Sequence, residues 1–93
     1  MFNDVDDFLM GTPKSKFIDI VFNANRNVVE AELERLIEWM AAMELILEKE
    51  YGVEDVEKKI RYFLADEENK AELENKVNSL YIESMGNILT QSE

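Results

Sequence analysis

The chain has 93 residues, of which 46% are hydrophobic and 33% charged, and 21 acidic against 10 basic residues give a formal net charge of −11. This length and composition are typical of one folded domain with a small core, to which a second subunit or a partner would add stability. The charge argues against direct nucleic-acid binding, because clustered Lys and Arg are needed to neutralise phosphates.

The N-terminus is acidic where a secretory or organellar targeting segment would be basic. The longest uninterrupted apolar run, from Trp39 to Met43, is far shorter than the roughly twenty residues needed to span a membrane. We therefore expect a cytoplasmic protein without a membrane segment.

Residues 1–11 form an acidic lead, which we interpret as a tail or a short first helical turn. Thr12 followed by Pro13 predicts the start of a short helix, since Thr can cap a helix and Pro is tolerated in its first position. The polar stretch 23–27 is expected to end this helix.

The dominant predicted helix runs from about residue 28 to Tyr51. Asn27 and Glu30 have the spacing of a capping box at its start, and Gly52 occupies the usual position after its end. Its apolar residues, many at an alternating four-and-three spacing, fall on one broad stripe. The stripe consists of Val29, Leu33, Leu36, Ile37, Trp39, Met40, Met43, Ile46, Leu47 and Tyr51.

Two further helices are predicted, at about 54–65 and 69–85, and residues 86–93 are expected to fray. No segment alternates long enough to form a strand, and the short connections favour antiparallel neighbours. The sequence therefore predicts an all-α protein in one domain, 1–93, folded as a small antiparallel bundle of about four helices with the second longest.

The residue types used for catalysis and metal binding are sparse. The chain contains no histidine and no cysteine, so its serines have no imidazole to activate them and thiolate chemistry is absent. The cluster of aspartates at 4, 6 and 7 fails the calcium-loop pattern, because Leu9 and Ser15 stand where Gly and Glu are required. We therefore expect a protein that is not an enzyme and that binds neither metal nor cofactor.

The acidic residues are concentrated in one region: between residues 28 and 57 there are ten acidic residues and two basic ones. The helical spacing places several of them opposite the apolar stripe. This acidic ridge consists of Glu30, Glu34, Glu38, Glu44 and Glu48. It either faces a protein partner with a basic surface or serves only solubility. Leu45 projects near its middle, as a contact anchor or as a position covered by another helix.

Two apolar features also allow two interpretations each. Phe8 and Leu9 lie in the acidic lead, where they form a docking motif or fold back to cover the core. The segment around Trp39, Met40 and Met43 is either core or an adaptable seam for a partner or for self-association.

Three short stretches carry a resemblance to a known family: Glu50-Tyr51-Gly52-Val53, Lys59-Ile60 and Asp7-Phe8-Leu9. They resemble the small late-transcription coactivators of large tailed phages, which bridge RNA polymerase and a sliding clamp. The likeness covers less than half of the chain, and Asp7-Phe8-Leu9 stands at the opposite end from the coactivators' clamp-binding tail. The resemblance implies an adaptor role.

These observations lead to three hypotheses. The first is a phage-encoded, non-enzymatic inhibitor of the anti-CRISPR or anti-restriction type, whose acidic ridge mimics nucleic acid in the basic groove of a target protein. The second is a transcription coactivator or adaptor that docks through apolar seams. The third is a structural helical homodimer.

Overall fold

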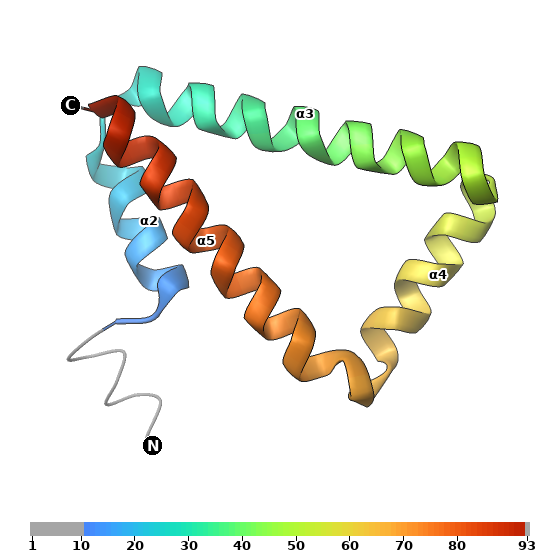
Figure 1. Cartoon of the computed structure of the whole chain (residues 1–93). Coiled ribbons are helices and arrows are strands. Elements are labelled where there is room, and N and C mark those ends of the chain that lie inside the picture. The colour runs from blue at the N-terminus through green and yellow to red at the C-terminus, as the bar shows by residue number, and fades with distance from the viewer. Residues whose placement is uncertain (1–10, 93) are drawn as a thin grey trace.

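The computed structural model describes residues 11–92, which fold into helices joined by very short connections (Figure 1). The helices are α2 (Pro13–Asn23), α3 (Arg26–Tyr51), α4 (Val53–Ala65) and α5 (Lys70–Ser92), with a 3-10 turn, η1 (Glu67–Asn69), before α5. The described residues contain no strand. The predicted all-α bundle is thus confirmed, with α3 as its longest helix.

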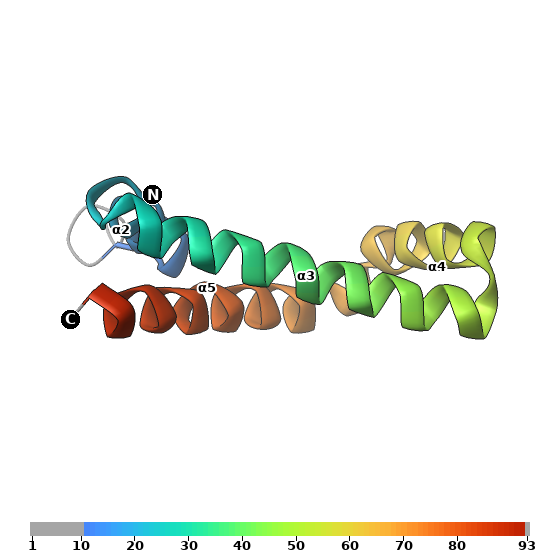
Figure 2. The same ribbon diagram turned by 90° about the horizontal axis from the view of Figure 1, so that it is seen from above.

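The helices form an open, flat frame. Helices α3, α4 and α5 lie along three sides of a triangle, and α2 lies beside the C-terminal part of α5 (Figure 1). The view from above shows how thin the frame is (Figure 2). Its extents are 41 × 37 × 15 Å, and its radius of gyration is 16.1 Å. A compact chain of this length would have a radius of gyration of about 12 Å.

Local signals set most of the helix boundaries. Thr12 and Ser15 cap α2 reciprocally, with each side chain accepting a hydrogen bond from the other's backbone N–H. Pro13 occupies the first helical position, as predicted. Gly52 ends α3 at φ +89°, a conformation that L side chains rarely adopt, and α4 begins at the next residue.

Two predicted boundaries were wrong. The cap of α3 is Asn25 rather than Asn27, because the Asn25 side chain accepts a hydrogen bond from the Asn27 backbone at 2.8 Å. Residues 86–92 do not fray but continue α5 through Gly86 to Ser92. Ile88, only 1% exposed, holds these last turns in place. Tertiary packing therefore overrides the local signal at Gly86.

The buried core is very small. Among the described residues, the buried hydrophobic side chains are Val29, Val56 and Ile88, and two polar ones, Glu32 and Ser84, are buried with them. Most of the apolar stripe predicted for α3 is therefore exposed, and only Val29 in it is buried. A frame one to two helices thick has no second layer to cover the rest.

Candidate protein-binding surfaces

The acidic ridge lies on α3 as its spacing predicts. Four of its carboxylate residues are exposed and Glu48 is half-buried. None of the five forms a salt bridge with another described residue. Leu45 is 55% exposed, so no helix of the described chain covers it. The five carboxylates thus have no salt-bridge partner among the described residues, and the exposed Leu45 lies near them.

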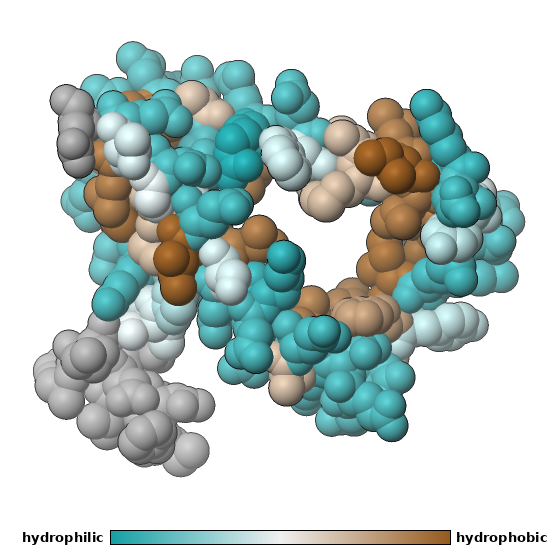
Figure 3. Space-filling view, in the orientation of Figure 1, coloured by the Kyte–Doolittle hydropathy of each residue, from teal (hydrophilic) through white to brown (hydrophobic). Residues whose placement is uncertain are grey.

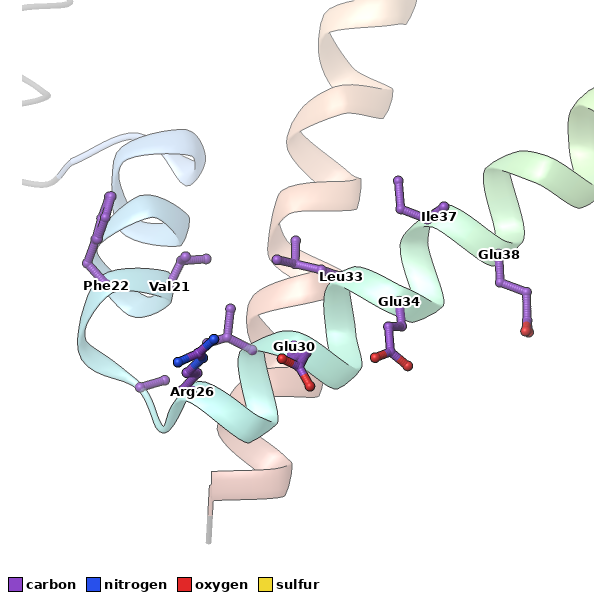
Figure 4. Close-up of a pocket in the computed structure, with 10 residues that line it drawn as sticks. Val21, Phe22, Arg26, Glu30, Leu33, Glu34, Ile37 and Glu38 are labelled. Atoms are coloured by element: carbon purple, nitrogen blue, oxygen red, sulfur yellow. The ribbon is translucent and has the colours of Figure 1, made fainter.

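The first half of the ridge borders a groove between α2 and α3, which we call the acidic groove (Figure 4). The groove has a volume of about 690 Å³. Leu33 and Ile37 project from one edge of α3, while Glu30, Glu34 and Glu38 project from the other edge (Figure 4). Its complete lining is Val21, Phe22, Ala24, Arg26, Val29, Glu30, Leu33, Glu34, Ile37 and Glu38.

A second apolar surface surrounds an opening through the middle of the frame, which the space-filling view shows to be unfilled by side chains (Figure 3). Hydrophobic side chains gather along the α4 side of this opening (Figure 3). A cavity of about 340 Å³ lies where α3, α4 and α5 supply Leu47, Phe63 and Leu73 among its lining. Another, of about 310 Å³, includes Leu36 and Val77.

The four-and-three spacing along α3 places Met40 and Met43 on the same face as Leu36 and Leu47. Met40 is 48% exposed and Met43 53% exposed. We call this face, together with the cavity linings on α4 and α5, the inner apolar surface. The described chain leaves it largely uncovered, which favours the seam interpretation of Met40 and Met43 over the core interpretation.

A buried polar cluster joins α3 to α5, and sequence analysis did not find it. The Glu32 carboxylate accepts hydrogen bonds from Arg35 Nε at 3.0 Å and from Arg35 Nη2 at 2.8 Å. The Ser84 hydroxyl and the Asn87 amide, both on α5, also donate to Glu32. The only local signal was the three-residue spacing of Glu32 and Arg35, which occurs often on exposed helix faces.

The cluster keeps Glu32 ionised. Burial by itself raises the pKa of Glu32, but hydrogen bonds from Arg35, Ser84 and Asn87, with the Arg35 charge, hold it below its ordinary value. The hydrogen bond to Glu32 raises the pKa of Arg35. Arg35 Nη2 also lies 3.9 Å from Oε1 of Glu83. Because every buried polar side-chain atom in the described region has a partner, this cluster is a structural anchor and leaves no free group for chemistry.

Phe8 and Leu9 lie outside the described residues. In the part of the chain that is described, no group of three or more acidic, His or Cys residues is placed to hold a metal ion. Nor does that part contain a helix with the length and apolarity that a membrane crossing requires.

Fold and surfaces together define a small, acidic, all-α protein whose apolar side chains largely remain uncovered. The chain belongs to the family described as Domain of unknown function (DUF2018), whose model matches residues 8–93. No curated protein matches the sequence. The inhibitor and coactivator hypotheses therefore stay predictions.

Proposed function

We propose that this chain acts without catalysis, by binding proteins, and that its working form is a homodimer in which a second copy covers the inner apolar surface. The observation that carries this proposal is the exposure of large hydrophobic side chains, Met40, Met43 and Phe63 among them, together with the apolar cavities that α3, α4 and α5 line. Soluble monomers rarely leave large contiguous apolar surfaces uncovered, and a chain this small gains stability from a second core.

Charge supports a second copy as the cover for this surface. The linings of both cavities are almost entirely apolar, with Lys59 as the one charged residue among them. Two copies, each carrying a net charge of −11, repel one another at long range. They can therefore associate best through faces on which acidic residues are absent, and no carboxylate of the ridge lines either cavity.

Sedimentation equilibrium over a range of concentrations tests this proposal. The expected particle has about twice the 10.9 kDa mass of one chain. Met43→Asp should shift the population toward monomer or unfolded chain, because it places a charge in the inner apolar surface. Leu45→Asp is the matched control, since Leu45 has nearly the same exposure but lies on the acidic ridge.

The proposal fails if the wild-type chain stays monomeric and folded at all concentrations. It also fails if the two aspartate variants sediment alike. Circular dichroism on each sample separates dissociation into folded monomers from dissociation coupled to unfolding.

A second candidate function is supported by the acidic ridge itself. Its carboxylates are unpaired among the described residues and share one face of a long helix, so they suit a partner with a basic, nucleic-acid-binding surface. In this role the chain would displace nucleic acid from its target, as a mimic. This second proposal is the inhibitor hypothesis of the sequence analysis, in which the acidic ridge mimics nucleic acid.

Displacement of labelled duplex DNA from basic proteins of the source organism tests the mimic role. Wild-type chain should compete at about 50 mM salt and lose most of its potency at about 300 mM, because salt screens exposed charges. Reversing the charges of Glu34, Glu38 and Glu48 to lysine should abolish competition. Potency that is independent of salt, or that survives the reversal, would rule this role out.

A further inference from the structure

We infer that the acidic groove binds one amphipathic helix of a partner protein, with the helix's apolar side in the groove and its Lys or Arg residues against Glu30, Glu34 and Glu38. This inference deepens the mimic proposal and rests on the acidic ridge being a binding surface. It differs from that proposal in the partner's chemistry, because the groove offers apolar contacts as well as charge.

The groove has the lining of a helix-binding site, with apolar side chains beside a row of charged ones. It is an open groove of about 690 Å³. Leu33 is 47% exposed and Ile37 60% exposed along it, and Phe22 at the end of α2 is 81% exposed. A ring this accessible beside a groove has few contacts with the other described residues and is available to pack against an incoming apolar side chain.

The three carboxylates of the groove are evenly spaced. Glu30, Glu34 and Glu38 follow one another at intervals of four residues, which corresponds to steps of about 6 Å along α3. A partner helix that carries Lys or Arg at intervals of four residues repeats the same step, so each cation meets one carboxylate when the two helices run side by side. Because charged rims mainly set specificity and association rate, this spacing selects the partner.

Arg26 gives the groove a direction. It lies in the first turn of α3, beyond Glu30, and is the only basic residue in the lining. An acidic side chain at one end of the partner helix would therefore favour the orientation that places it against Arg26.

A second copy of the chain does not fit this pattern. No two of its ten Lys and Arg residues are spaced four apart, so none of its own helices carries the matching row of cations. The acidic groove therefore suits a different protein, whereas the inner apolar surface suits a second copy.

Isothermal titration calorimetry with designed peptides tests the inference on the full-length chain. The probe is a peptide of about 18 residues with Leu at helical spacing and Lys every four residues on the adjacent face. The comparison peptide has the same composition in a scrambled order that destroys both patterns. Wild-type protein should bind the patterned peptide at least about tenfold more tightly than the scrambled one, and more weakly as salt rises.

Matched variants locate the binding. Replacing Glu30, Glu34 and Glu38 together with Gln should weaken peptide binding at least about tenfold, and Phe22→Ala should weaken it separately. The control replaces Glu44 and Glu48 with Gln, which removes ridge charges outside the groove. This control should change the affinity less than about threefold.

The possible contrary results separate a failure of the groove inference from a failure of the mimic role. Equal affinity for both peptides, or no binding, refutes the groove inference. Equal loss with the control variant also refutes it but leaves the mimic role in place, because the whole ridge then acts by charge alone. If the groove variants instead dissociate the dimer in sedimentation, a second copy occupies the groove and the inference is wrong. Peptide binding without displacement of DNA overturns only the mimic role.

Discussion

The buried cluster around Glu32 leads to a quantitative prediction. Glu32→Gln keeps the size of the side chain but removes the charge on which Arg35, Ser84 and Asn87 converge. Breaking a fully buried ion pair costs about 3–5 kcal/mol. The side chain of Arg35 is 31% exposed and can turn toward water, which lowers this cost. The remaining loss is that of hydrogen bonds to a charged group, and we expect about 2–3 kcal/mol of lost unfolding free energy.

Urea denaturation followed by circular dichroism at a fixed protein concentration measures this loss. Glu34→Gln is the matched control, since Glu34 is exposed and forms no salt bridge with the described residues; it should change stability by less than about 0.5 kcal/mol. If Glu32→Gln unfolds at the same urea concentration as the wild type, the cluster does not hold α3 against α5.

The difference in unfolding free energy between wild type and Glu32→Gln should also depend on pH. The folded-state pKa of Glu32 is lowered, so its stabilisation is complete above the unfolded-state value of about 4.3 and disappears as pH falls through the folded-state pKa. The difference between wild type and Glu32→Gln should therefore shrink as pH falls below about 4. A difference that stays constant down to pH 3 would contradict this reasoning.

Two further predictions concern packing and backbone. Ile88→Ala should lower the unfolding free energy by about 2–5 kcal/mol, because Ile88 is buried. Leu89→Ala, at a position that is 51% exposed, should lower it much less. Equal losses in urea denaturation would mean that burial of Ile88 does not hold the last turns of α5 in place. Gly52→Ala should destabilise by about 1 kcal/mol because of the positive φ. Gly86→Ala lies within α5, where the added Cβ meets no atom within 4 Å apart from its chain neighbours and the local helix backbone, and it should raise the melting temperature. The reasoning requires the melting temperature to fall for Gly52→Ala and to rise for Gly86→Ala; a change in the same direction for both variants would contradict it.

Sequence analysis could place Glu30, Glu34 and Glu38 on one face of a helix because exposed positions on a helix follow the 3.6-residue period directly. Glu30, Glu34 and Glu38 therefore lie together on α3 in the structure. The period does not say what lies beside them. That α2 turns back to form a groove with the same residues depends on contacts between segments distant in sequence, as does the pairing of Glu32 with Ser84.

The helices, most of their ends and the uneven distribution of charge could be predicted from the residues alone, because these depend on neighbours within a few residues. Thr12, Pro13 and Gly52 act at the positions that their chemistry predicts. Whether the apolar stripe of α3 is a core or a surface depends on how the helices pack against one another. A hydrophobic period shows that a face avoids water but not what covers it, and the described part of the flat frame leaves Met40 and Met43 about half exposed.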